Sequence, residues 1–474
     1  MRFVSVGRAL RGLFFAATGL VVLNAEAQNR TLRIVTYNIQ ADIGVTNKQP
    51  TFTNIMTSAA EGPPLPGLVA PPTTPGNYAA GGVLEGIGEE VVGGNAQPLD
   101  ILALQETTSN PATVAPIVNA LNTFYGVAGM YSGSPYQATE SGGNPGVGNG
   151  PNALIYNTRT VQLLASVPVD PPGGTSNLGG VSSGYSGEYR EVMRYQFAPA
   201  GVAANAANSF YIYVSHYKSG VATTANNTNS RAAEAFIIRS NLLTSLPTGA
   251  RILHVGDFNT GDASEKMYAT LTAPGTNALL DPLNPTRSLT TNFDGSAVPG
   301  NLTDAATYLQ YRDDYQMMTT NIFYGSPGGL ALVPGSYHSF GNNGTTAYLD
   351  TVNTAGNTSL NNRLVTNGPV FISAAQLLVD LTGASDHLPI VADFTIPLPT
   401  PVIANFSLAG TNLIITLANS ITGGVFTVLT SANLSLPRTN WTALATNVAT
   451  SGTFRFTNGL NPAAPAQFYL FQEK

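Results

Sequence analysis

The chain contains no cysteine among its 474 residues, and this absence removes several kinds of site at once. Without cysteine there is no disulfide, no thiolate metal site and no cysteine nucleophile. Charge is also scarce, because only 10% of the residues are charged and the 26 acidic residues outnumber the 20 basic ones. Such a balance argues against passive binding of nucleic acid through a wide basic surface. It does not exclude a polyanionic substrate that is held by a metal ion.

Long apolar runs are scarce as well, and one lies close to the N-terminus, from Leu13 to Leu23. It is shorter than the about 20 residues that span a membrane comfortably. Three arginines precede the run, and the small-x-small sequence Ala25-Glu26-Ala27 follows it. This pattern is typical of a secretory signal peptide that is cleaved after Ala27. We therefore expect a signal peptide over residues 1–27 and a secreted protein, extracellular or periplasmic, with no stable membrane span; a retained anchor is the alternative.

The 43% hydrophobic content is enough to build a core, and its distribution indicates the fold class. Short apolar runs alternate with helical patterns between residues 31 and 398, which predicts an α/β domain with buried sheets. The candidate helices are 113–124 and 229–246. The candidate strands are 32–39, 100–106, 153–157, 210–217, 251–257 and 388–396. Segments 43–98, 132–150 and 170–187 are rich in glycine and proline, serine or alanine, and we expect them to be loop insertions.

A second module follows the proline-rich segment 396–402. Residues 399–474 carry short β-like runs at close spacing, which predicts a small all-β module. The expected organisation is therefore a signal peptide over 1–27, a main domain over 28–398 and a β-rich module over 399–474. The module resembles small β-domains at the ends of secreted bacterial proteins, a resemblance that carries no chemistry. It is expected either to contact a surface or polymer, to serve sorting, or to be a structural appendage.

Polar side chains stand where several of these strands end. Asn38 ends the first strand, Glu106 the second and His216 the fourth, while Asp257 ends the strand 251–257. Each of these residues alone has an ordinary explanation, such as a turn or a satisfied core histidine. Together they predict a site, because strand ends hold side chains rigidly and burying so many polar groups is costly without a shared cation.

Five short motifs, in this order, resemble the endonuclease/exonuclease/phosphatase superfamily with its DNase I-like fold. They are "TYNIQ", "DILALQE", "VSHYKS", "GDFN" and "SDHLPI". The resemblance covers residues 31–398 and implies a four-layered α/β/β/α sandwich. It also implies hydrolysis of phosphate esters with Mg²⁺; Mn²⁺ or Ca²⁺ are possible substitutes.

The resemblance implies a role for each matching residue. The implied metal ligands are Glu106, Asn38 and Asp386. The implied catalytic residues are His387, His216, Asp257, Asn259 and Asp314, with Asp314 orienting His387 and its neighbour Asp313 as the alternative register. The arginines proposed for the phosphate side are Arg190, Arg194 and Arg231, with a solvated helix face as the alternative for Arg231.

The substrate class follows less directly. A signal peptide and a main domain without tryptophan lower the expectation of a DNA-repair enzyme. We expect a secreted phosphodiesterase, with an extracellular endonuclease on DNA or RNA as the first hypothesis. The alternatives are a sphingomyelinase-like or other phosphoesterase, and a non-catalytic binding protein on the same scaffold.

Overall fold

A computed structural model describes most of the chain. The described residues are 18–21, 29–40, 82–107, 113–134, 151–169, 192–220, 225–260, 262–364, 373–422, 424–460 and 466–473. They form two compact units, which are treated separately below. The larger unit consists of residues 31–198 and 206–396, and the smaller unit of residues 1–30, 199–205 and 397–474.

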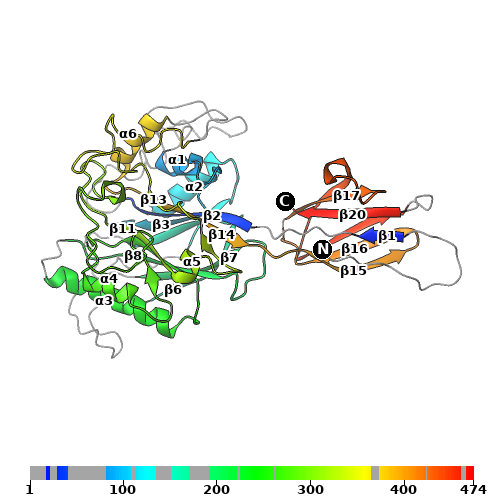
Figure 1. Cartoon of the computed structure of the whole chain (residues 1–474), viewed down its shortest axis with the longest axis horizontal. Helices are drawn as coiled ribbons and strands as arrows, with labels where there is room; N and C mark the ends of the chain where they lie inside the picture. Colours follow the sequence, from blue (N-terminus) through cyan, green and yellow to red (C-terminus); the bar gives the residue numbers. More distant parts are fainter. Residues whose placement is uncertain are drawn as a thin grey trace. The chain divides into compact units, whose positions relative to one another are not determined.

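The larger unit contains two sheets (Figure 1). The first sheet has the order β12-β14-β2-β3-β5-β4, with β13 paired to β14, and the second has the order β10-β11-β9-β8-β7-β6. The strands of the first sheet are β2 (Asn29–Asn38), β3 (Ile101–Gln105), β4 (Tyr131–Gly133), β5 (Ala153–Asn157), β12 (Ala331–Leu332), β13 (His338–Ser339) and β14 (Ile390–Pro397). Those of the second are β6 (Val161–Pro168), β7 (Met193–Pro199), β8 (Phe210–His216), β9 (Ile252–Asp257), β10 (Leu279–Leu280) and β11 (Asp314–Thr319).

Helices cover the outer face of each sheet, as Figure 1 shows for α1, α2 and α6 on one side and α3 and α4 on the other. They are α1 (Val83–Glu89), α2 (Ala115–Phe124), α3 (Ala225–Thr244), α4 (Lys266–Thr272) and α6 (Ala374–Ala384), while the short α5 (Thr320–Phe323) follows β11 and the 3-10 turn η3 (Pro299–Asn301) precedes it. The predicted helices 113–124 and 229–246 correspond to α2 and α3. The helix α1 lies within the segment 43–98 that the sequence predicts to be a loop insertion, so that prediction is wrong for residues 83–89.

Three buried clusters separate the four layers. Consecutive residues of β2 show the alternation, because Ile34 packs between the two sheets while Val35 packs under α1, α2 and α6. In the second sheet Val255 faces the first sheet, whereas Ile252 faces α3 and α4. Side chains on a strand point alternately to its two faces, so a strand that is apolar throughout is buried on both. The larger unit is therefore the predicted four-layered α/β/β/α sandwich.

The smaller unit is all-β, as predicted for the C-terminal module. One sheet has the order β15-β16-β19 and the other the order β1-β20-β17-β18. Its elements are β1 (Thr18–Val21), β15 (Val402–Ala409), β16 (Asn412–Ala418), β17 (Val425–Ser431), β18 (Thr442–Val448), β19 (Thr453–Gly459), β20 (Ala466–Glu473) and the 3-10 turn η4 (Arg438–Asn440). The strand β1, which lies inside the predicted signal peptide, pairs in parallel with β20.

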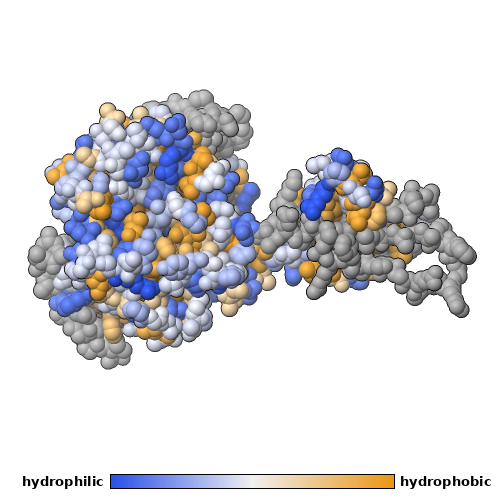
Figure 2. Space-filling view, in the orientation of Figure 1, coloured by the Kyte–Doolittle hydropathy of each residue, from blue (hydrophilic) through white to orange (hydrophobic). Residues whose placement is uncertain are grey.

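The surface agrees with the low charge of the sequence. Figure 2 shows hydrophilic and hydrophobic residues mixed over the visible face of the larger unit. Within the described residues, no helix is long and apolar enough to cross a membrane.

Candidate active site

The candidate site lies where strands from both sheets end. In the first sheet β2 and β3 run in parallel, and Asn38 is the register partner of Gln105, so that Glu106 follows directly. In the second sheet β8 and β9 run in parallel, with His216 opposite Asp257. The parallel pairing brings the carboxyl ends of neighbouring strands to one edge, which is where α/β folds place their sites. The strand β11 runs antiparallel to β9 and begins there, with Asp314 opposite Asp257.

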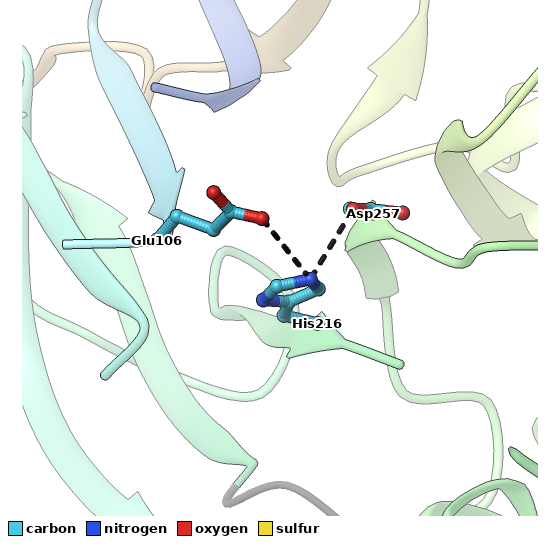
Figure 3. A group of neighbouring side chains, drawn as sticks. All are labelled: Glu106, His216 and Asp257. Carbon is cyan, nitrogen blue, oxygen red and sulfur yellow. Dashed lines mark ion pairs between the residues drawn. The ribbon is translucent and has the colours of Figure 1, made fainter. Parts of the chain in front are cut away.

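Three of the predicted residues converge in Figure 3, namely Glu106, His216 and Asp257. The Nε2 atom of His216 lies 3.3 Å from Oδ2 of Asp257 and 3.6 Å from Oε1 of Glu106. Their side chains are almost fully buried, with exposed fractions of 2% for His216 and Asp257 and 8% for Glu106. One ligand atom from each lies within 4.8 Å of the other two, so the three residues can hold one cation together.

Asn38 joins the two sheets at this point. Its Nδ2 group donates hydrogen bonds to Oε1 of Glu106 at 3.1 Å and to Oδ2 of Asp257 at 3.0 Å. An amide nitrogen can only donate, so it fixes both carboxylates as acceptors while satisfying part of their charge. The asparagine therefore sets the separation of the two carboxylates across the sandwich.

The same turn follows β2 and β9. Backbone N–H of Gln40 donates to Oδ1 of Asn38, and backbone N–H of Asn259 donates to Oδ1 of Asp257, in each case two residues on. Gln40, Asn259 and Glu106 all have left-handed backbone conformations, with φ of 49°, 49° and 55°. Such conformations cost free energy in residues other than glycine and are concentrated at functional sites. The strand ends are thus bent sharply so that their polar side chains stay at the edge.

His387 lies beside this cluster and is oriented by Asp314. Its Nδ1–H donates to Oδ2 of Asp314 at 2.8 Å, while its Nε2 is 3.8 Å from Oδ2 of Asp257. Burial alone would lower the pKa of His387, but the carboxylates of Asp314 and Asp257 outweigh it and raise the pKa well above 6.5. These carboxylates therefore favour the protonated imidazole, and of the two adjacent aspartates it is Asp314 that orients it.

A second acidic group surrounds the other side of His387. Asp304, Asp386 and His387 each place a ligand atom within 4.8 Å of the other two. The carboxylate of Asp386 accepts from Nε2 of Gln40 at 2.6 Å and from the hydroxyl of Ser385 at 3.3 Å. The predicted metal ligands are thus divided, with Glu106 in the first group and Asp386 in the second.

Two further carboxylates lie in this region: Asp313, which the motifs offered as the alternative to Asp314, and Asp304, which they missed. Burial raises the pKa of Asp304, with the charges of Asp386 and Asp314 adding to it and His387 opposing it. Burial likewise raises the pKa of Asp313 well above its ordinary value, and Asp257 and Asp304 reinforce this. No sequence signal identifies Asp304, because it stands in a loop and joins the site only through tertiary pairing with His387. Gln40, by contrast, could be found from the sequence, because it is the last residue of the motif "TYNIQ".

The side chain of Asn259 contacts the end of β8. Its Nδ2 group donates to the backbone carbonyl of Tyr217 at 3.1 Å, which ties the turn after β9 to the end of β8. Asn259 therefore supports the turn that carries Asp257.

Two of the three predicted phosphate-side arginines, Arg231 and Arg194, have partners outside the cluster. Arg231 is fully buried and forms a two-pronged ion pair with Glu265, with N–O distances of 2.8 and 2.9 Å. Arg194 donates to Oδ1 of Asn241 at 2.8 Å and lies over the ring of Tyr211. Both guanidinium groups are engaged with residues of the helical layer, so the structure gives them structural partners in place of a phosphate. Arg190 lies outside the described residues.

The donor set of the first group suits a divalent cation. Glu106 and Asp257 supply carboxylate oxygens, which a hard cation such as Mg²⁺ prefers, and His216 supplies one imidazole nitrogen. Two carboxylates that are buried within reach of the same imidazole would repel each other without a compensating positive charge. The residues present therefore fit a bound divalent metal.

Comparisons with known proteins find only remote similarities. No family model matches the chain, and no curated protein matches it. Among solved structures, the chain is similar to the human Nocturnin catalytic domain with bound sulfate, at 16% identity and a TM-score of 0.41, covering 78% of this chain and 96% of that one. It is also similar to D. rerio TDP2 complexed with single strand DNA product, at 13% identity and a TM-score of 0.39, covering 77% of this chain and 98% of that one.

A third similar solved structure comes from a bacterium. It is an endonuclease/exonuclease/phosphatase family protein from Bacteroides thetaiotaomicron, at 12% identity and a TM-score of 0.36, covering 78% of this chain and 97% of that one. These similarities are remote, so the functional interpretation depends on this chain's own residues. Of these three structures, the one from Bacteroides thetaiotaomicron carries the name of the superfamily that the sequence motifs resemble.

Proposed function

We propose that the chain is a secreted, divalent-metal-dependent phosphodiesterase that cleaves DNA or RNA internally. The observation that carries this proposal is the convergence of Glu106, His216 and Asp257 on one point, beside a histidine that Asp314 orients. Secretion is supported by the leader pattern of residues 1–27. The C-terminal module is proposed to contact a surface or polymer.

The metal site of this proposal consists of Glu106, Asp257 and His216, with Asn38 fixing the two carboxylates. A bound divalent cation supplies positive charge to the phosphate oxygens during hydrolysis. The protein's contribution is to hold two carboxylates at a fixed separation in a buried setting, where electrostatic interactions are stronger than in water.

His387 acts as the protein's own positive charge in this scheme. The carboxylates of Asp314 and Asp257 raise its pKa, which favours the imidazolium form. Its Nδ1–H is bound to Asp314, whereas its Nε2 is 3.8 Å from Asp257 and 4.0 Å from Asp386, beyond hydrogen-bond distance. The Nε2–H group is therefore oriented to donate to a phosphate oxygen, and this hydrogen bond would strengthen as negative charge develops there.

The test is hydrolysis by the purified chain. Plasmid DNA, single-stranded DNA, RNA, sphingomyelin and bis-p-nitrophenyl phosphate would each be incubated with Mg²⁺, Mn²⁺, Ca²⁺ or EDTA. We expect cleavage of nucleic acid that EDTA abolishes and that His387→Ala and Glu106→Gln lose. His338→Gln is the control histidine variant, because His338 pairs with Glu90 and the backbone of Ser336.

Metal binding has a readout that does not depend on activity. Mg²⁺ should raise the thermal unfolding temperature of the wild type and of His338→Gln, because a ligand that binds only the folded state stabilises it. It should not stabilise Glu106→Gln. Nucleic acid cleavage that persists in EDTA and in His387→Ala would overturn the proposal, and turnover of sphingomyelin alone would assign a lipid phosphodiesterase instead.

A further inference from the structure

A tight hairpin, residues 303–311, lies against the candidate site. Its two ends are joined by reciprocal backbone bonds, since the N–H of Tyr311 donates to the carbonyl of Asp304 at 2.7 Å and the N–H of Asp304 donates back at 3.0 Å. Asp304 also forms a β-bridge with His387. The same residue therefore connects the hairpin to the histidine of the site.

Further backbone contacts fix the hairpin on several sides. The N–H of Ala306 donates to the carbonyl of Asp386 at 2.6 Å, and the N–H of Leu388 donates to the carbonyl of Thr303 at 2.8 Å. On the other side, the N–H of Leu349 donates a hydrogen bond to the carbonyl of Leu309 at 2.8 Å. A hairpin tied to the segment 386–388 cannot move independently of His387, so its side chains keep a fixed position relative to the site.

The hairpin presents two tyrosines to solvent. Tyr308 is 50% exposed and Tyr311 is 39% exposed. Tyr311 pairs with Asp304, which in turn pairs with His387, so the hairpin that carries both tyrosines lies beside the site. Two exposed rings on one fixed hairpin offer a surface that a substrate can contact.

The chemistry around the hairpin limits what this substrate part can be. The sequence from Thr303 to Tyr311 contains no lysine or arginine. Tyr311 lies near the carboxylates of Asp294 and Asp313. Burial and these two charges raise its pKa. This surface therefore does not attract a phosphate, an anionic lipid or another anion. It suits an uncharged, flat ring, which a tyrosine can stack against and whose edge a phenol can hydrogen-bond.

We propose that Tyr308 and Tyr311 form a stacking site for an unpaired nucleobase next to the scissile phosphate, which makes single-stranded nucleic acid the preferred substrate. This inference rests on the proposed function and deepens it. A base in a duplex is already stacked and paired, whereas an unpaired base can be splayed out and placed on an aromatic side chain. DNA and RNA share this chemistry, and the two are separated by the test.

The experiment compares oligonucleotides with the full chain and its variants. Substrates would be single-stranded DNA, single-stranded RNA, a duplex, and a single strand with abasic residues on both sides of the cleaved linkage. The variants would be Tyr308→Ala, Tyr311→Ala, their combination, and the corresponding phenylalanine substitutions, which keep the ring. Tyr324→Ala is the matched control, because Tyr324 is 69% exposed but follows α5, at the opposite end of β11.

The wild type is expected to cleave single strands faster than the duplex. The double alanine variant should lose on the order of 5- to 100-fold in kcat/KM on single strands, which corresponds to the stacking of one base. Its rate on the abasic substrate should be unchanged. The phenylalanine variants keep the ring but lose the phenol, so they should keep most of the wild-type rate, and Tyr324→Ala should match the wild type. Because the substituted side chains are exposed, thermal unfolding should be unaffected, which separates loss of stacking from loss of folding.

The outcomes distinguish this inference from the function it rests on. If the wild type cleaves no nucleic acid under any metal condition, the proposed function fails and the inference fails with it. If the wild type cleaves single strands and the double alanine variant does so equally well, or loses the abasic substrate to the same extent, only the stacking site is overturned. Loss of sphingomyelin turnover in the alanine variants, with nucleic acid untouched, would overturn it in favour of a lipid contact.

Discussion

Asp314 begins β11 directly opposite Asp257 on β9, yet only Asp314 accepts the hydrogen bond from Nδ1 of His387. The two carboxylates are register partners in one antiparallel pair, and they face the same imidazole from its two nitrogens. One of them fixes the ring and its tautomer, while the other lies 3.8 Å from the free nitrogen. Asp314 therefore orients the ring, while Asp257 lies beside its other nitrogen without a hydrogen bond to it.

The first prediction concerns Asp314→Asn. Removing this charge should lower the pKa of His387, because the Asp314 carboxylate is the largest influence that raises it. His387 would then lose its proton at lower pH, so the alkaline limb of the rate profile should move to lower pH. We expect kcat to fall on the order of 10²- to 10⁴-fold, as when an orienting carboxylate is lost elsewhere. Both effects are read from kcat against pH.

The neighbouring aspartate provides the control for this prediction. Asp313 is buried next to Asp314, but its carboxylate does not accept from Nδ1 of His387. Asp313→Asn should therefore leave the alkaline limb closer to the wild type. An equal displacement in both variants would contradict the specific role of Asp314.

Local sequence features were sufficient to predict much of this architecture. Strand-ending residues such as Asn38, His216 and Asp257 could be found because each one follows a short apolar run that forms a strand by itself. The four layers follow from the same runs, since strands that are apolar on both faces must be covered twice. The short helix α1 was missed because its sequence, "VLEGIGE", contains two glycines and lies in a glycine-rich segment.

Long-range partners explain what the sequence did not predict. Arg231 was expected to face the phosphate, but its partner Glu265 is 34 residues away, and nothing local indicates that pairing. Asp304 joins the site through the hairpin that ends at Tyr311, which is a consequence of tertiary pairing. The partners of polar residues in loops and helices are distant in the sequence and become known only from the fold. A residue at a strand end can be located from the sequence, because the apolar run before it marks the strand.

A glycine inside β9 allows β8 and β9 to approach each other closely beside the site. Gly256 has φ of 138°, and a Cβ atom there would collide with the backbone carbonyl of Ser215 on the neighbouring strand. Gly256→Ala should push β8 and β9 apart and displace Asp257 from His216. The collision and the unfavourable φ each cost about 1–3 kcal/mol. We expect a clear loss of stability in urea unfolding, together with loss of stabilisation by Mg²⁺.

Gly249→Ala is the matched control for this substitution. Gly249 also has a positive φ, 79°, but a Cβ atom there meets nothing within 4 Å. Only the conformational cost remains, about 1–2 kcal/mol, and Mg²⁺ should still stabilise this variant. Equal losses in the two variants would show that the approach of the strands is not what Gly256 provides.

Substitutions in the buried ion pair between Arg231 and Glu265 test whether this arginine has a structural role. Both side chains are almost fully buried, so Arg231→Met leaves an uncompensated carboxylate, which typically costs about 3–5 kcal/mol. The double variant Arg231→Met/Glu265→Leu should recover most of that loss, because no buried charge is left. Urea unfolding of the three proteins measures this. If Arg231 instead binds phosphate, the double variant would be stable but its KM would rise strongly.

The last prediction concerns the pH dependence of stability at Glu90. Its carboxylate is fully buried and lies 2.9 Å from Nε2 of His338 and 2.8 Å from Arg363. Burial alone would raise the pKa of Glu90, but His338 and Arg363 outweigh it and hold the pKa below 4.5. A carboxyl group with a depressed pKa stabilises the fold above its unfolded pKa and loses that contribution as the pH falls through its folded pKa.

Glu90→Gln should therefore be less stable than the wild type at pH 7, by about 3–5 kcal/mol for a broken buried pair. The difference between the two proteins should shrink as the pH falls below about 4.5, because the wild type then gains a proton that the variant cannot. Urea unfolding across this pH range measures it. Arg363→Met should cost less, since that side chain is 35% exposed and water already screens its charge. A difference that stays constant down to the acid transition would mean that Glu90 is not ionised in the native protein.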